Sequence, residues 1–225
     1  MESFLNPDVL RRLLISAPAI LVAITFHEVA HGFVANKLGD PTAKFVGRLT
    51  LNPLVHIDPF GTIILPLLMY FMTNGQFVFG YAKPVPINPM NFQNPRKGMA
   101  LSAVAGPVMN IALALISAIV LKLLLVPLST VMPAEVNETI LKPLYLIATA
   151  SVVINVVLAS FNMIPIPPLD GGRVLTGLLP QKQAMSFSRI EPFGFIIVLV
   201  LIYTGMANLF IMPLIRFFLQ LFQVY

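Results

Sequence analysis

Cysteine and tryptophan are absent from this 225-residue chain, and charged residues are scarce. Without cysteine the protein can form no disulfide, no thiolate zinc site and no cysteine nucleophile. Charged residues make up 10% of the sequence and hydrophobic residues 57%, whereas soluble domains carry about a quarter charged residues. This balance excludes a soluble enzyme and predicts a protein of the lipid bilayer. The composition gives no sign of a nucleic-acid-binding domain.

Long apolar runs predict an all-α polytopic membrane protein. Since one crossing takes about 20 helical residues, we expect about five to six transmembrane helices. The runs 7–37, 95–126, 143–163 and 191–210 are the clearest spans, with a polar loop over 127–142. We expect residues 1–225 to form a single transmembrane domain, with a core over about 10–175 and C-terminal helices over 190–225.

Two further segments predict short β-hairpin or re-entrant membrane-associated structure. Thr62–Met72 is apolar but too short for an independent span, so it either crosses with help from its flanks or re-enters. Gln76–Asn88 combines aromatic residues with Lys83-Pro84-Val85-Pro86, which favours a hairpin or a re-entrant loop. Ala43–Asn52 alternates loosely and predicts a short strand or an extended loop.

The distribution of Lys and Arg indicates orientation. The loops before the 95–126 span and after Met163 carry three basic residues each, whereas the loop between those spans carries two, which are offset by two glutamates. Because cytoplasmic loops are enriched in Lys and Arg, the first two loops are predicted to be cytoplasmic. The net charge of +5 fits the same pattern. Arg11 and Arg12 precede an apolar run as in a signal peptide, but we expect a retained first span.

The first apolar segment contains a polar cluster, since His27, Glu28 and His31 are the only ionisable residues from Leu13 to Ala35. A charge at membrane depth costs several kcal/mol, so such a cluster indicates a functional site. Residues i and i+4 share one face of a helix, which lets both imidazoles reach one metal ion. Glu28 lies beside the first histidine, where it could act on a water at the metal.

A third ligand is needed, because catalytic zinc takes three protein ligands and a carboxylate commonly completes the set. Asp170 stands out among the nine acidic residues. It follows a span and a Pro-x-Pro-Pro segment, and two glycines follow it. Prolines restrict the backbone and glycines permit close approach, so Asp170 is the predicted third ligand.

Three motifs now match a family: His27-Glu28-x-x-His31, Gly80-x-x-Lys83-Pro84-Val85-Pro86, and Asn162-x-x-Pro165-x-Pro167-Pro168-Leu169-Asp170-Gly171-Gly172. The chain resembles the site-2 proteases, which are intramembrane zinc metalloproteases. Gly106-Pro107 and Asn110 resemble the small-residue signature of that family on an intervening span. The resemblance extends over roughly residues 18–173, and the chain resembles a minimal member without the PDZ or CBS domain of many relatives.

The resemblance implies one Zn²⁺ per chain, bound by His27, His31 and Asp170, with Glu28 as the catalytic base. Asn162 would polarise the scissile carbonyl or hold the oxyanion. The implied substrate is a transmembrane segment of another protein, cut in regulated intramembrane proteolysis. The implied location is the cell membrane as a multi-pass protein, with an active site inside the bilayer that opens toward the cytoplasm.

Other interpretations remain open at this point. The protein could be a non-proteolytic zinc-binding transporter or scaffold, because such proteins also need metal ligands. Asn162 could form a simple interhelical hydrogen bond, and Asn155 is better explained as a structural residue. His56 is a candidate fourth zinc neighbour or gate residue, although an ordinary loop histidine is the simpler interpretation. Nothing in the sequence indicates an oligomeric state.

Overall fold

The structure is a computed structural model that describes residues 7–72 and 80–224, with residues 7–14 described by their backbone. Helices and loops make up this part of the chain, and it contains no strand. The helical elements, in chain order, are α1 Pro7–Lys37, α2 Thr42–Phe45, η1 Pro53–His56, η2 Pro59–Ile64, α3 Leu65–Met72, η3 Pro89–Asn91, α4 Pro95–Val120, η4 Leu121–Leu125, α5 Val126–Val131, α6 Ala134–Val136, η5 Asn137–Leu141, α7 Lys142–Asn162, α8 Asp170–Leu178, α9 Gln181–Ser188, α10 Glu191–Tyr203 and α11 Asn208–Phe222.

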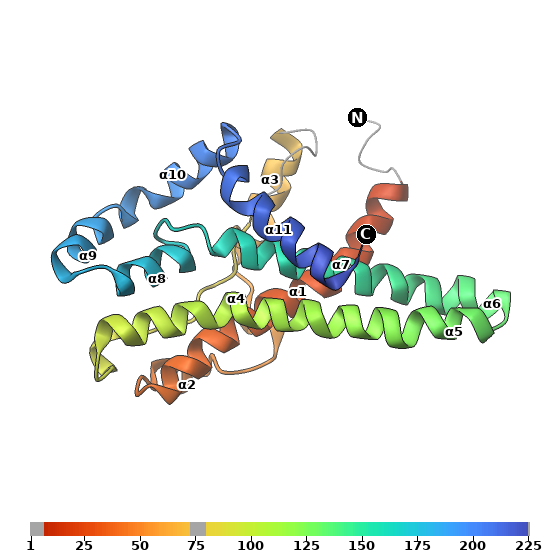
Figure 1. The fold of residues 1–225 in the computed structure, drawn as a ribbon, viewed down its shortest axis with the longest axis horizontal. Coiled ribbons are helices and arrows are strands. Elements are labelled where there is room, and N and C mark those ends of the chain that lie inside the picture. The colour runs from red at the N-terminus through yellow and green to blue at the C-terminus, as the bar shows by residue number, and fades with distance from the viewer. Residues whose placement is uncertain (1–6, 73–79, 225) are drawn as a thin grey trace.

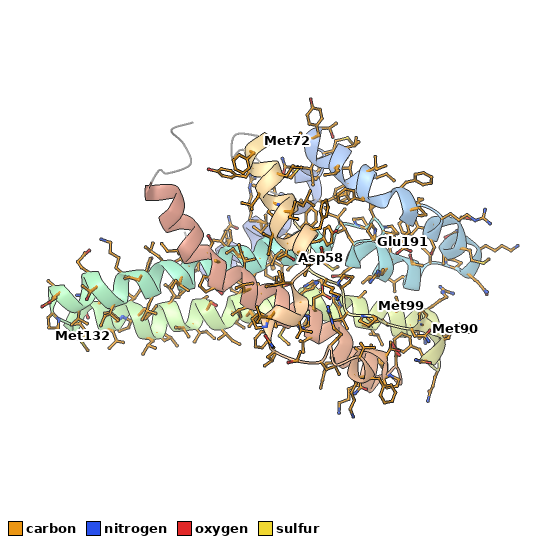
Figure 2. The ribbon with its side chains drawn as sticks, turned by 180° about the vertical axis from the view of Figure 1, so that it is seen from behind. Asp58, Met72, Met90, Met99, Met132 and Glu191 are labelled. Carbon is orange, nitrogen blue, oxygen red and sulfur yellow. The ribbon has the colours of Figure 1, made fainter. Side chains whose placement is uncertain are left out.

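Two long antiparallel helical arms form the frame of the molecule (Figure 1). α4 continues through η4 into α5, and the chain returns through α6 and η5 into α7, which packs along α4. α1 packs on both arms, α8 packs on α4, and α11 packs on α7. Small residues such as Ala114 and Ala118 lie buried where α4 meets α7 and α11, and small residues let membrane helices approach closely. Figure 2 shows the two ends of the frame, with Met132 at one end and Met90 and Met99 at the other.

The number of spans is smaller than the five to six expected. Within the described residues three helices are long and apolar enough to cross a membrane: Ile15–Lys37, Pro95–Val131 and Ala134–Asn162. A fourth span is possible if α9 and α10, which are bent by 69°, are counted as one. The expectation failed because two of the apolar segments form short helices, Pro59–Met72 and Asn208–Phe222. The fifteen-residue α11 would extend about 22 Å, which is short of the roughly 30 Å hydrocarbon core.

The polar loop expected over 127–142 is also mostly helical, with a break at Met132–Pro133. Three widened π-helical turns each precede a proline: η2, η4 and η5 lie before Pro66, Pro127 and Pro143. A proline cannot donate to the carbonyl four residues earlier and clashes with it. In each case that carbonyl lies inside the widened turn, so these helices continue through a residue that usually ends them.

The predicted hairpin over Gln76–Asn88 is not seen where the structure describes it, since 80–88 contains no strand and 73–79 lies outside the described residues. From Tyr81 to Val85, every second N–H of this segment nevertheless donates a hydrogen bond to another part of the chain. Tyr81 N donates to Gly61 O at 3.0 Å, and Lys83 N donates to His56 O at 2.9 Å. Val85 N donates to Glu28 Oε2 at 2.8 Å, so this segment reaches the polar cluster of α1.

A buried arginine holds the 80–88 segment against the preceding loop. Arg48 is 7% exposed, and its guanidinium donates to Val55 O at 2.6 Å and to Lys83 O at 2.5 Å. Ala43–Asn52, expected as a strand or extended loop, begins within the short helix α2 and continues as loop. The five donors of a guanidinium can bind several carbonyls at once, which lets Arg48 replace the hydrogen bonds that a strand pair would have made.

Asp40 joins the end of α1 to the loop that follows the 80–88 segment. Its side chain is fully buried. Oδ2 accepts from Asn88 N at 2.6 Å, and Oδ1 accepts from Asn91 Nδ2 at 2.7 Å and from Thr42 Oγ1 at 2.5 Å. Burial alone would raise the pKa of Asp40, but the hydrogen bonds donated to the carboxylate outweigh it and hold the pKa below its usual value.

Asp40→Asn is therefore expected to cost about 1–3 kcal/mol of unfolding free energy at neutral pH, because a charge-assisted acceptor is lost. The folded pKa lies below the unfolded value of about 3.9, so this stabilisation is present above about pH 4 and is lost as the pH falls through the folded pKa. Unfolding in detergent micelles, followed against pH, measures the difference. Glu135→Gln, at an exposed carboxylate, is the control. The expectation would be contradicted if the wild type and D40N differed in unfolding free energy by the same amount in acid as at neutral pH.

Candidate metal centre and active site

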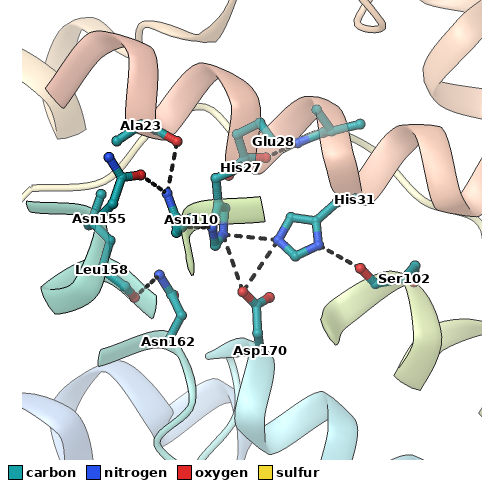
Figure 3. Close-up of polar contacts among 11 residues, drawn as sticks. Ala23, His27, Glu28, His31, Ser102, Asn110, Asn155, Leu158, Asn162 and Asp170 are labelled. Atoms are coloured by element: carbon teal, nitrogen blue, oxygen red, sulfur yellow. Dashed lines mark hydrogen bonds and ion pairs between the residues drawn. The ribbon is translucent and has the colours of Figure 1, made fainter. Parts of the chain in front are cut away.

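Three buried side chains from two elements meet between α1 and α8 (Figure 3). His27 and His31 lie on α1, and Asp170 is the first residue of α8. The two Nε2 atoms are 3.0 Å apart, and they lie 3.2 Å and 3.3 Å from Asp170 Oδ2. The three residues are 6–8% exposed. In the described part of the chain they form a group whose ligand atoms lie within 4.8 Å of one another.

Hydrogen bonding determines which nitrogen of His31 faces this group. His31 Nδ1 lies 2.7 Å from the backbone carbonyl oxygen of Ser102. Because a carbonyl can only accept a hydrogen bond, Nδ1 must carry the proton. In the neutral imidazole Nε2 then presents a lone pair toward Asp170, as a metal ligand does.

Asp170 Oδ2 is buried and receives no hydrogen bond within the described residues. A buried carboxylate oxygen without a donor is costly, and here it faces the Nε2 atoms of His27 and His31. The donor set of two imidazoles and one carboxylate is that of a catalytic zinc site with an open position. The site therefore fits a divalent cation, which would satisfy the orphaned oxygen.

Glycines make room for this arrangement on both sides. A Cβ at Gly106 of α4 would lie 2.4 Å from His31 Nε2 and 2.6 Å from His27 Cε1. A Cβ at Gly171 would lie 2.3 Å from Met163 O, and one at Gly172 would lie 2.2 Å from Pro167 N. The glycines after Asp170 thus allow the start of α8 to pack against the preceding turn, which is the close approach expected from the sequence.

Glu28 lies beside the group and lines the same cavity as His27. One of its carboxylate oxygens, Oε2, accepts the hydrogen bond from Val85 N, and Oε1 has no partner among the described residues. The backbone of the 80–88 segment thereby orients the carboxylate and leaves one oxygen able to take a proton. This arrangement suits a general base.

Asn162 lies across that cavity, which has a volume of about 170 Å³. Its Nδ2 donates to Leu158 O at 3.0 Å, so one N–H of the amide is used within α7, and the second has no partner among the described residues. The residues lining the cavity are Ile24, His27, Glu28, Gly80, Tyr81, Ala82, Leu158, Phe161, Asn162 and Leu169. The cavity therefore places a metal ligand, an acid and an amide around one space.

His56 is not part of the metal-ligand group found among the described residues. It is fully buried, its Nε2 lies 2.9 Å from Thr50 O, and its carbonyl accepts from Lys83 N.

The contacts of His27 and His31 with α4 were not expected from the sequence. Asn110, an amide in an apolar span, was the one signal of them, because the carbonyl of Ser102 has no sequence signature.

Comparisons with known proteins agree on one family. The profile of peptidase family M50 matches residues 126–205. The chain is 39% identical over 197 residues to "Putative zinc metalloprotease YwhC" of Bacillus subtilis (strain 168), a match that covers 88% of this chain and 84% of that protein.

Two more distant relatives carry a similar name. "Putative zinc metalloprotease Rip2" of Mycobacterium tuberculosis (strain H37Rv) is 29% identical over 188 residues, covering 84% of this chain and 66% of that protein. Its namesake in Mycolicibacterium smegmatis is 27% identical over 202 residues, covering 88% of this chain and 70% of that protein. No solved structure matches the chain significantly.

Proposed function

Because this chain belongs to peptidase family M50, the site-2 protease family, we propose that it hydrolyses a peptide bond within or near the transmembrane segment of another membrane protein. The chain is a zinc metalloprotease of the membrane by family and composition. One observation carries the finer proposal: His27, Glu28 and His31 lie in the candidate span Ile15–Lys37, with Asp170 beside them. A site at that depth is suited to a membrane-embedded substrate.

In this proposal His27, His31 and Asp170 hold one zinc ion. When bound, zinc polarises a peptide carbonyl and lowers the pKa of a water toward about 7. Glu28 takes the proton on Oε1, while Val85 N keeps the carboxylate oriented through Oε2, and the acid later passes the proton to the leaving amine. The free N–H of Asn162 donates to the carbonyl oxygen as negative charge develops there.

We place the site toward the cytoplasm. The start of α4 and the elements α8 and α9 lie at the same end of the frame (Figure 1), and Arg96 of α4 donates to Gly177 O of α8. Basic residues concentrate at this end, as cytoplasmic loops do. These residues are Arg96, Lys97, Arg173, Lys182 and Arg189.

The 80–88 segment is proposed to bind the substrate backbone. A helical peptide bond is shielded by its own hydrogen bonds, so a substrate helix must unwind before hydrolysis. The N–H groups of Tyr81, Lys83 and Val85 are occupied, whereas that of Ala82 has no partner among the described residues and Ala82 lines the cavity. An unwound strand can pair with this free group as an added strand pairs with a sheet edge.

Ala82→Pro should therefore lower kcat/KM about 3- to 10-fold, because one main-chain hydrogen bond to the substrate contributes roughly 0.5–1.5 kcal/mol. Zinc content should stay at the wild-type level. Cleavage of a single-span reporter protein in proteoliposomes gives the rate. Ala82→Val enlarges the side chain and keeps the N–H, so equal losses in both variants would point to crowding of the cavity and would refute backbone pairing.

Membrane proteomics tests the function as a whole. Cells producing the wild-type chain are compared with cells producing Glu28→Gln at the same level. We expect a small set of single-span proteins to accumulate at full length in the variant and to be cleaved in the wild type. Identical membrane proteomes, together with no cleavage of any single-span protein by the purified wild type, would reject the proposal.

A further inference from the structure

A line of buried hydrogen bonds runs from the metal centre into the interface between α4 and α7 (Figure 3). His27 Nδ1 lies 2.6 Å from Asn110 Oδ1. Asn110 Nδ2 donates to Asn155 Oδ1 at 2.8 Å, and Asn155 Nδ2 donates to Ser151 O at 2.9 Å. Both asparagines are fully buried. Burying two amides in an apolar interface is costly unless each is hydrogen-bonded, and here both are.

The direction of these bonds is determined by two backbone carbonyls. Asn110 Nδ2 also donates to Ala23 O at 3.2 Å, and Asn155 Nδ2 donates to Ser151 O. A carbonyl can only accept, so the nitrogen of each amide must point toward its carbonyl. The oxygen of Asn110 is then left facing His27, and His27 Nδ1 must be the donor of that bond.

This direction determines the tautomer of His27. With the proton on Nδ1, the neutral ring presents the lone pair of Nε2 toward Asp170. His31 is held in the same tautomer by a backbone carbonyl, that of Ser102, which no side-chain change removes. We propose that Asn110, itself oriented by Asn155, is the positioning residue that holds His27 in its metal-binding tautomer and orientation. This inference rests on the metal site of the proposed function, not on its substrate.

Interhelical packing is the competing explanation, because asparagines join membrane helices by hydrogen bonds. The chain supplies a control for it on the same pair of helices. Ser117 Oγ lies 2.8 Å from Ser151 Oγ, so Ser117→Ala removes an α4–α7 hydrogen bond and leaves the bond from Asn155 to the Ser151 carbonyl intact. If Asn110 only joins the helices, its substitution and Ser117→Ala should have similar effects on zinc affinity. If Asn110 positions His27, its substitution should lower zinc affinity, whereas Ser117→Ala should not.

The test measures metal binding by the purified full chain in detergent micelles. Zn²⁺ affinity is determined by competition with a chelator, and the d–d spectrum of the Co²⁺-loaded protein reports ligand geometry. Asn110→Leu keeps the branching of the side chain and removes the acceptor, so we expect zinc affinity to fall about 10- to 100-fold, as for other partners of ligating histidines, with a changed Co²⁺ spectrum. Asn110→Asp restores an acceptor for His27 Nδ1 and should recover most of the affinity.

Asn155→Leu should lower the affinity by a smaller factor, because Ala23 O still orients Asn110. Ser117→Ala should bind zinc as the wild type does. Wild-type affinity and spectrum in Asn110→Leu, or an equal loss in Ser117→Ala, would overturn the proposal. If Asn110→Leu does not fold, unchanged zinc affinity in Asn155→Leu overturns it instead. Since no readout requires cleavage, the proposed function can fail while this inference stands, and the reverse also holds.

Discussion

Glu28→Gln is expected to lower kcat/KM for a single-span substrate by about 10²- to 10⁴-fold, the usual contribution of a general base. Glutamine has nearly the same shape, and its side-chain oxygen can still accept from Val85 N, where the carboxylate accepts at 2.8 Å. It cannot take a proton at neutral pH. The position of the side chain is therefore kept while its chemistry is lost.

The measurement is cleavage of a purified single-span protein in proteoliposomes, with zinc content determined on the same sample. Zinc should remain at about one ion per chain, because Glu28 is outside the ligand group. Glu191→Gln, which removes a carboxylate on α10, is the matched control and should cleave normally. Undiminished cleavage by E28Q would remove Glu28 from the role of base. If E28Q binds zinc and the wild type cleaves no single-span protein, the result would favour a non-proteolytic zinc-binding transporter or scaffold.

Asp170→Asn is expected to weaken zinc binding by more than about 100-fold, and activity should fall with it. Partners that only orient a ligand are worth about 10- to 100-fold in affinity, and a direct anionic ligand should exceed them. The asparagine amide can donate to an imidazole Nε2, where Asp170 Oδ2 now lies 3.2 Å from His27 and 3.3 Å from His31. The metal-free variant should therefore fold normally.

Thermal unfolding with and without added zinc separates loss of metal from loss of fold. A ligand that binds the folded state stabilises it by mass action, so a hundredfold loss of affinity removes about 2.7 kcal/mol of zinc-linked stabilisation. We expect zinc to raise the Tm of the wild type and of Glu191→Gln, and to raise that of D170N much less. Equal zinc-induced shifts in all three proteins would exclude Asp170 as a ligand.

Prediction from the sequence succeeded for local features. The first helix was expected over 7–37 and is found as Pro7–Lys37, because a long, mostly apolar run ends just before a glycine with positive φ, Gly39. The number of spans was wrong because the apolar helices Pro59–Met72 and Asn208–Phe222 are too short to cross, and α10 reaches a sufficient length only together with the bent α9. The loop expected over 127–142 was wrong because Pro127 and Pro143 were interpreted as helix ends. The π-helical turns η4 and η5 absorb these prolines, and whether a helix adopts a widened turn depends on what packs around it.

The site shows the same difference between local features, which the sequence predicts, and tertiary contacts, which it does not. The shared face of His27 and His31 follows from helical spacing, and the proline-bounded position of Asp170 marked it as a candidate. Their partners could not be inferred, because the contacts join residues far apart in the chain. His27 and Asn110 are separated by 83 positions, His31 and Ser102 by 71, and Glu28 and Val85 by 57.

The amino-acid sequence by itself determined the membrane setting, the helix that carries two imidazoles and an acid, and the set of candidate ligands. Composition and helical period are local properties, so they can be interpreted before any packing is known. Only the tertiary structure decided that Asp170 Oδ2 meets both Nε2 atoms, which tautomer His27 adopts and how Glu28 is oriented. Each of these depends on contacts between separate elements, and those contacts exist only once α1, α4, α7, α8 and the 80–88 segment have packed together.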